Sequence, residues 1–402
     1  MEATNSASTH PDAAGSPVLL IGVAMVCKLV LNTARRFVYP FAPSLSTGLG
    51  VPLTAITSLI GVNQATSILG ILFGPIADRF GYKRTMLAGL GMLVVGMAAA
   101  GLFPYYHVIL ITLFLAGLGK SIFDLALQAH VGVTVPFRQR ATAIGLMEIS
   151  WAGSALVGIP AIGLAIQAWG WRSPFLCMGV MGLLAGMLLY RAVLKDLEGT
   201  QQGQRVAKVK NLWNLLGSKG SVKGMLVFCL LFSLANDNLF VVYGAWMEKR
   251  FHLSIVALGF GTSVIGAAEL GGEFLTALIA GRLGLKRCSI GGLVLTIFCY
   301  FLLPLWGHRV LTALGALFII FFLFEFTIVT TLSLSTELLP EARATMMAAF
   351  FSAAGLGRAL GAVIGGHVWL ASGLYGTVLV SALSSALALV FFVRGLRHWP
   401  CK

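Results

Sequence analysis

The ionisable and amide side chains inside long apolar runs are the residues of this chain with the clearest potential for chemistry. Of its 402 residues, 58% are hydrophobic and only 10% are charged. In hydrocarbon an ionisable group is costly unless it is paired or hydrated, so such a group is functional by default. The candidates for ligand binding or proton transfer are Asn32, Arg35, Arg36, Lys120, Asp124, Glu148, Asn236, Asp237, Glu269, Glu325 and Arg358.

Several of these residues recur at helical spacing and therefore share a face. Lys28, Asn32, Arg35 and Tyr39 follow one another at steps of three or four residues. The polar interior of the first half is mainly basic and that of the second half mainly acidic. Opposite charges in the two halves would nearly balance, as buried charges must.

Three carboxyl groups, Asp124, Asp237 and Glu325, are candidate proton carriers. Burial favours the protonated form of a carboxylic acid, and a nearby base favours the ionised form. Arg35 or Arg36 would hold an anionic group of a ligand or act on Asp124. We expect these residues to face a cavity between the two halves, lined by the first, fourth, seventh and tenth apolar runs.

Simpler interpretations of the same residues stay open. Arg36 is close to Pro40 and could extend to the membrane surface, and Lys120 and Asp124, one helical turn apart, could simply neutralise each other. Glu273 could belong to a gate rather than to the cavity. The sequence contains no metal-ligand spacing and no nucleotide-binding loop, so we expect no metal, no cofactor and no coupling to ATP within this chain.

The elements that position these residues are expected to be membrane-spanning helices. A soluble domain has about 25% charged residues, far more than this chain. Backbone groups in hydrocarbon must bond within their own segment, so a run of about 20 apolar residues is a spanning helix. Twelve such runs occur, at 18–45, 54–77, 83–103, 108–134, 142–166, 173–194, 224–247, 255–280, 287–305, 310–336, 344–370 and 374–394.

The basic residues predict how these helices are oriented. Most of the 28 Lys and Arg residues lie in loops on one side of the twelve runs, whereas the opposite loops hold Arg172, Lys249, Arg250 and Arg309. The positive-inside rule then places both termini in the cytoplasm. The net charge of +14 reflects this topology and attraction to anionic lipid, not a nucleic-acid partner.

The longest polar stretch divides the chain into two sets of six runs. We expect a disordered cytoplasmic N-terminus over 1–17, an N-terminal six-helix bundle over 18–194 and a cytoplasmic linker over 195–223. A C-terminal six-helix bundle over 224–394 and a cytoplasmic tail over 395–402 complete the predicted organisation.

The two halves share a charged turn. The stretch "GPIADRFGYKR" (74–84) is followed 203 residues later by "IAGRLGLKR" (279–287), in which Arg79, Gly81 and Lys83 have counterparts at the same spacing. The pair Arg140-Ala141 recurs as Arg343-Ala344 with the same offset. Two independent loops with one offset indicate an internal duplication, an architecture of transporters that bind substrate between their halves.

At these residues the chain resembles the major facilitator superfamily, over essentially its whole length. "GPIADRFGYKR" is similar to that family's signature between the second and third spans, and "WRSPF" (171–175) to the motif that opens its sixth span. The general character of the sequence resembles that of bacterial efflux permeases of the drug:proton antiporter group. The resemblance implies a conformational gate in which Asp78 meets the start of the eleventh span, built from Gly74, Asp78, Arg79, Gly81, Lys83 and Arg84.

Two departures weaken the antiporter inference. The fifth run reads "GSALVGIPAIG" (153–163), in which Ile159 separates a Gly-Pro pair that antiporters keep together, and Leu113 stands where the group frequently has Arg. Pro160 still permits a kinked, closely packed helix. The role of the missing Arg could pass to Lys120 or Arg35.

The resulting hypothesis is a secondary active transporter rather than an enzyme, in a bacterial inner membrane. It would move a small organic solute by alternating access, most simply as proton-coupled efflux by a monomer. The alternative is a proton-coupled uptake symporter for an organic anion or metabolite, which the three bases of the first run favour. The partners expected are a small-molecule substrate, protons and the lipid bilayer.

Overall fold

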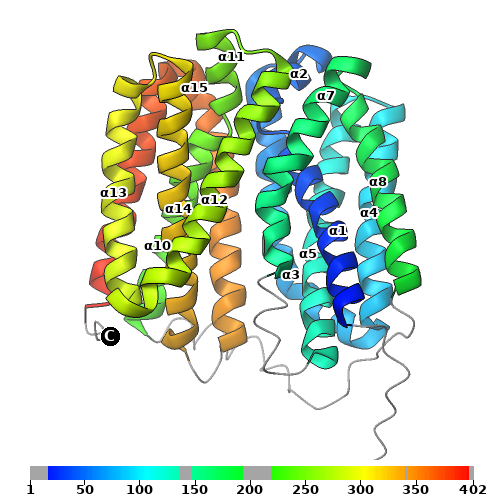
Figure 1. Cartoon of the computed structure of the whole chain (residues 1–402), viewed down its shortest axis with the longest axis horizontal. Coiled ribbons are helices and arrows are strands. Elements are labelled where there is room, and N and C mark those ends of the chain that lie inside the picture. Colours follow the sequence, from blue (N-terminus) through cyan, green and yellow to red (C-terminus); the bar gives the residue numbers. More distant parts are fainter. Residues whose placement is uncertain (1–16, 136–145, 193–218, 340–342, 398–402) are drawn as a thin grey trace, which may run out of the picture.

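The computed structural model describes residues 17–135, 146–192, 219–339 and 343–397, which form helices joined by short turns (Figure 1). The first half contains α1 (Pro17–Arg36), α2 (Ala42–Leu49), α3 (Leu53–Phe80), α4 (Tyr82–Leu102), α5 (Tyr106–Thr134), a helix over Leu146–Trp169 that includes the π-helical turn η1 (Ser154–Gly158) and α7 (Ile159–Trp169), and α8 (Ser173–Ala192). The second half contains α10 (Gly220–Phe240), α11 (Tyr243–Phe251), α12 (Ile255–Leu283), α13 (Leu285–Trp306), α14 (Val310–Leu338) and α15 (Arg343–Gly395).

These helices make the twelve predicted crossings. Within the described residues, nine helical segments are long and apolar enough to cross a membrane. The last of them, in α15, contains two crossings, because the chain turns at Gly373 with φ 59° and ψ −147°. α3, bent by 118° from α2, adds another candidate, and α1 lies among the long helices of the first group in Figure 1, at the place of the first predicted run. The chain is therefore an all-α, multi-pass membrane protein, as predicted.

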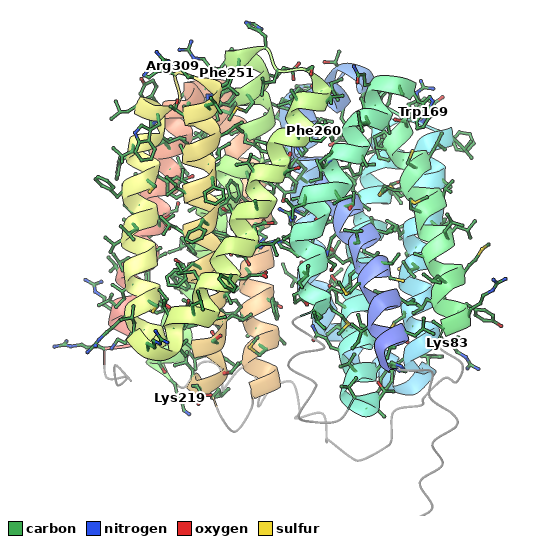
Figure 2. All side chains as sticks on the ribbon, in the orientation of Figure 1. Lys83, Trp169, Lys219, Phe251, Phe260 and Arg309 are labelled. Atoms are coloured by element: carbon green, nitrogen blue, oxygen red, sulfur yellow. The ribbon has the colours of Figure 1, made fainter. Side chains whose placement is uncertain are left out.

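Figure 1 shows the two groups of helices side by side, with the start of α1 and the end of α15 at the same end of the molecule. We call this end, which carries Lys83 and Lys219, the basic end (Figure 2). We call the opposite end, where α2 and α11 lie, the capped end. Trp169, Phe251 and Arg309 lie at the capped end in Figure 2.

The backbone confirms the internal duplication. Gly81 has φ 91° and ψ 144°, and Gly284 has φ 87° and ψ 136°. Gly170 and Gly373 form a second pair with positive φ at the same offset of 203 residues. Only glycine adopts these angles without strain, so the two halves use equivalent turns between equivalent helices.

The first and seventh spans differ from the continuous runs expected from the sequence. α1 ends at Arg36 and the chain makes a turn before α2, since Pro40 cannot donate a backbone hydrogen bond. α10 ends at Phe240 and α11 begins at Tyr243. The two breaks meet at the capped end, where a Cβ atom added to Gly244 would lie 2.3 Å from the carbonyl oxygen of Pro40.

Small residues bring the two bundles together. A Cβ atom on Gly366 would lie 2.1 Å from Oγ1 of Thr57, and one on Gly266 would lie 2.9 Å from the carbonyl oxygen of Ala152. The hydrophobic effect does not drive helices together in lipid. Small residues instead let the helix backbones approach closely, so that van der Waals contacts hold the helices together. These contacts join α3 to α15 and the Leu146–Trp169 helix to α12, towards the capped end and the middle of the molecule.

Some expectations lie outside the described residues. These are the N-terminal segment to residue 16, most of the predicted linker (195–218), and residues 398–402 of the predicted tail. α10 begins at Gly220, four residues before the predicted start of the seventh run. The side chains of Gly74, Asp78 and Arg79 also lie outside the described set, although their backbone is part of α3.

Candidate substrate and proton site

A pocket lies at mid-depth between the two bundles. Glu269, Glu325 and Arg358 sit near the middle of α12, of α14 and of the first crossing of α15. We call the space that they share the central pocket; it is lined by Arg36, Tyr39, Gln64, Trp151, Asn236, Asp237, Phe240, Glu269, Phe321, Phe324, Glu325 and Arg358. Its charged groups come from both groups of helices: Arg36 belongs to the first, and Asp237, Glu269, Glu325 and Arg358 belong to the second.

Arg36 and Glu269 form a bidentate ion pair across the interface. Nη1 of Arg36 donates to Oε2 of Glu269 at 3.0 Å, and Nη2 donates to Oε1 at 2.7 Å. Arg36 is only 1% exposed, so the interpretation that it extends to the membrane surface is wrong. The planar guanidinium matches the geometry of the carboxylate, and the pair joins α1 to α12.

Asp237 accepts a second hydrogen bond across the interface. The hydroxyl of Tyr39 donates to Oδ1 of Asp237 at 2.7 Å, and Nε2 of Gln64 donates to the Tyr39 hydroxyl at 2.6 Å. Nε of Arg358 lies 3.8 Å from Oδ2 of Asp237. A series of side-chain contacts thus runs from Gln64 in α3 to Arg358 in α15 and includes residues of both bundles.

Glu325 differs from the other carboxylates of the central pocket. It is 9% exposed, and within the described residues it has no hydrogen bond and no basic group within 4.0 Å. Its neighbours Phe321 and Phe324 line the same pocket, and Phe324 packs on Phe232 with ring centroids 4.8 Å apart. An unpaired carboxyl group against an apolar wall is suited to bind a proton or a cationic group.

A second group of charges lies inside the N-terminal bundle, and we call it the lysine cluster: Lys28, Lys120, Asp124 and Glu148. Nζ of Lys28 bonds to Oε1 of Glu148 at 2.5 Å and lies 4.0 Å from Oδ1 of Asp124. Lys120 contacts Asp124 directly. The cluster is balanced in charge and does not line the central pocket, so α5 contributes less to that pocket than expected. Nearby, Asn32 donates to Ser150 at 3.2 Å.

Within the part of the chain that the structure describes, the buried cation Arg35 has no carboxylate within 4.0 Å. Its Nη2 donates to Oε1 of Gln64 at 2.5 Å and to Oγ of Ser67 at 2.8 Å. Its Nε has no hydrogen-bond partner within the described residues. Arg35 therefore stands behind Gln64, one residue away from the wall of the central pocket, rather than in it.

Trp151 and Gln64 are site residues that our reading of the sequence missed. The guanidinium carbons of Arg36 and Arg358 lie 4.4 and 5.4 Å from the Trp151 ring centroid, and Nζ of Lys120 lies 5.9 Å from it. Trp151 is therefore a neutral surface on which three cations gather. The sequence feature that could have identified Trp151 is its position three residues after Glu148, next to a run of small residues.

The π-helical turn follows Trp151 and frees backbone carbonyl groups for contacts with other helices. Arg36 donates to the carbonyl oxygen of Trp151 at 3.0 Å. Oγ of Ser263, from the other bundle, donates to the carbonyl oxygens of Ala155 and Leu156 at 3.4 and 3.1 Å. π-Helical turns are frequent at functional sites, and this one ends directly before Ile159 and Pro160, at the start of α7.

The candidate gate is only partly visible. Gly81 forms the turn between α3 and α4, and Nζ of Lys83 lies 4.3 Å from the centroid of the Tyr190 ring. Arg84 follows Lys83 in the first turn of α4. The expected contact between Asp78 and the start of α15 falls on side chains outside the described residues.

Comparisons with known proteins agree on the class of molecule. The family profile of the Major Facilitator Superfamily matches residues 24–237 and 225–399. The chain is 25% identical to the MFS-type transporter YceJ of Bacillus subtilis, over 78% of this chain and 79% of that protein. It is 24% identical to the class C tetracycline resistance protein of Escherichia coli (70% of each chain). It is 25% identical to the bacillibactin exporter of Bacillus subtilis, over 70% of this chain and 72% of that protein.

The fold is also that of solved transporters. A bacterial homologue of the human lysosomal transporter Spinster, in an inward-facing and unoccupied conformation, matches with a TM-score of 0.75. The match covers 94% of this chain and 95% of that chain at 14% identity.

Proposed function

This chain belongs to the Major Facilitator Superfamily, and from that premise we propose that it exports a small organic solute in exchange for protons. Membership makes it a secondary transporter rather than an enzyme. Export is the activity named for the bacillibactin exporter. Exchange for protons is our inference from the central pocket.

The observation that carries the proposal is Glu325, a buried carboxyl group that lines the central pocket and has no basic group within 4.0 Å among the described residues. A proton on Glu325 would neutralise it, and the neutral form is cheaper in a region of low dielectric. A substrate that approaches Glu325 would release the proton, and a proton would release the substrate. Such competition at one group is sufficient to couple two opposite fluxes.

The contacts between the bundles couple the central pocket to the conformational change. The Arg36–Glu269 pair and the Tyr39–Asp237 hydrogen bond join helices of opposite bundles at the pocket. Opening the capped end requires these contacts to break and the close approach of Gly244 to Pro40 to separate. We propose that the bundles over 18–194 and 224–394 pivot about the pocket as units.

We further propose that the basic end faces the cytoplasm, with both termini there. The positive-inside rule supports this orientation, since Lys83 and Lys219 lie at that end (Figure 2). The turn with Gly81, Lys83 and Arg84, together with Gly74, Asp78 and Arg79, would then be the cytoplasmic gate. A fluorescent protein fused after Lys402 should fluoresce in cells, and alkaline phosphatase fused at the same point should be inactive. The reverse result would contradict the orientation.

Transport by the purified chain in proteoliposomes tests the proposal. An imposed pH gradient should drive uptake of at least one compound from a panel of drugs, sugars and organic acids into inside-out vesicles. Glu325→Gln should lose the response to the gradient, whereas Glu248→Gln, at an exposed position of α11, should keep it. A wild-type flux that ignores the gradient would contradict proton coupling.

The uptake symporter remains the second candidate, because Arg35 and Arg358 offer cationic donors beside the same pocket. The direction of the coupled proton flux separates the two mechanisms. In inside-out vesicles, export predicts that protons leave the lumen as the compound enters. Symport predicts that both move in the same direction.

A further inference from the structure

The central pocket presents two charged groups of opposite sign that are not paired with each other. Glu325 and Arg358 both line it, and no ion pair within 4.0 Å joins them. Nε of Arg358 and Oδ2 of Asp237 are 3.8 Å apart, which is beyond hydrogen-bond distance, and the side chain of Arg358 is 24% exposed. Among the described residues, neither terminal amino group of Arg358 donates a hydrogen bond. Its two terminal amino groups therefore remain available to a ligand, as does the carboxylate of Glu325.

The remaining charges of the pocket are occupied. Both guanidinium amino groups of Arg36 bond to Glu269, and the carboxylate of Asp237 receives the Tyr39 hydroxyl. Glu273, one turn from Glu269 along α12, is half-buried and is not among the lining residues. The free positions are thus one cation and one anion on helices α15 and α14.

Charge balance decides which ligand these two positions suit. The lining residues carry two cations and three carboxylates, and the buried cation Arg35 lies directly behind Gln64. The region is therefore near neutrality, and a ligand with a net charge would disturb it. A cation alone would leave the amino groups of Arg358 unpaired, and an anion alone would leave Glu325 unpaired, each at a desolvation cost.

Resting on the proposed transport function, we propose that the substrate is a zwitterion with an apolar side group. Its anionic group is held by the amino groups of Arg358, and its ammonium group by Glu325. The apolar group lies against Phe240, Phe321 and Phe324, which all line the pocket; the ring centroids of Phe240 and Phe321 are 5.2 Å apart. Amino acids with large side chains and related zwitterions have this chemistry.

Matched ligands test this assignment without any proton gradient. Calorimetric titration of the purified full-length chain would compare three sets, each with a zwitterion, an amine that lacks its carboxylate and an acid that lacks its ammonium group. The sets are phenylalanine, phenylethylamine and phenylpropionate; tryptophan, tryptamine and indolepropionate; and leucine, isoamylamine and 4-methylpentanoate. In at least one set the zwitterion should bind about tenfold more tightly than either partner, the scale of one hydrogen bond to a charged group.

Two variants assign the two ends of the ligand. With Arg358→Gln, the zwitterion should bind no better than the amine; with Glu325→Gln, it should bind no better than the acid. Glu248→Gln should leave the preferences unchanged, and thermal unfolding of each variant shows whether it is folded. Should Glu325→Gln fail to fold, Arg358→Gln alone decides the assignment.

Equal binding within every set, a preference for the amine or the acid in every set, or the absence of binding by all nine compounds would overturn the proposal. The proposed function fails separately. A preference for zwitterions without a response to the pH gradient would contradict proton coupling and leave the site intact. A transporter driven by the gradient that prefers amines would contradict this inference alone.

Discussion

The lysine cluster and the central pocket contain the same kinds of residues in different arrangements. The charges of the lysine cluster pair with one another inside the N-terminal bundle. In the central pocket Arg36 pairs with Glu269 across the interface, Arg358 approaches Asp237 within the C-terminal bundle, and Glu325 has no basic partner among the described residues. Pairs inside one bundle persist when the bundles move, whereas pairs across the interface must break. The comparison indicates that the lysine cluster supports the fold and that the central pocket responds to ligand and conformation.

The largest expected effect comes from replacing the unpaired carboxyl group. Glu325→Gln should abolish proton-driven transport in proteoliposomes and should leave the folded state intact, because no ion pair is lost. The matched change in the lysine cluster, Asp124→Asn, should retain a response to the gradient. Should Asp124→Asn lose coupling while Glu325→Gln keeps it, the roles that we assign to the two regions would be reversed.

The pair across the interface should show the next largest effect. Arg36→Met or Glu269→Leu alone leaves a buried charge without its partner, which destabilises a protein by about 3–5 kcal/mol. The double variant removes both charges and should recover most of that loss. Thermal unfolding of the four proteins, arranged as a double-mutant cycle, measures the coupling between the two residues. Additive effects would show that the pair does not join the bundles.

The closest approach of the two broken helices should be sensitive to a single methyl group. Gly244→Ala places a Cβ atom 2.3 Å from the carbonyl oxygen of Pro40, and such overpacking costs about 1–3 kcal/mol. The variant should open the capped end, seen as faster labelling of cysteines introduced there. Gly186→Ala is the control, because a Cβ atom at Gly186 meets nothing within 4 Å. Equal labelling rates in both variants would contradict the claim that the contact between Gly244 and Pro40 keeps the capped end closed.

The smallest effect is expected where a whole ion pair of the lysine cluster is removed. Lys120→Met combined with Asp124→Leu deletes both charges of a contact inside one bundle, and such replacements are often neutral or stabilising, by about 1–4 kcal/mol. Transport should change little, and the unfolding temperature should stay equal or rise. A loss of transport comparable to that of Glu325→Gln would place the lysine cluster in the pathway.

The fold followed from the sequence because its causes are local or repeated. Apolar runs of sufficient length must become helices in lipid, and the offset of 203 residues reappears in the turns at Gly81 and Gly284. The breaks before α2 and α11 were not expected, since the apolar pattern continues through both. The reason for these breaks is a tertiary contact: Pro40 and Gly244, which are 204 residues apart in the sequence, approach each other closely at the two breaks.

The candidate site was predictable in its residues but not in its pairing. Spacing identified Arg36, Glu269 and Glu325 as charges inside spans, yet which charge meets which depends on contacts between segments about 230 residues apart. Because buried charges are costly, positive and negative groups must nearly balance, but this requirement does not determine which cation pairs with which carboxylate. Trp151 and Gln64 carry no charge and gave no comparable signal, so only the packing of the helices brings them to the pocket.

Distances measured by electron paramagnetic resonance at the two ends of the molecule test the central claim most directly. Spin labels would replace Trp169 and Leu311 at the capped end, and Val133 and Leu283 at the basic end, all exposed positions, in a chain without its six cysteines. Alternating access about the central pocket predicts that a change of pH or ligand lengthens one distance and shortens the other. Two distances that change together, or that do not change at all, would contradict it.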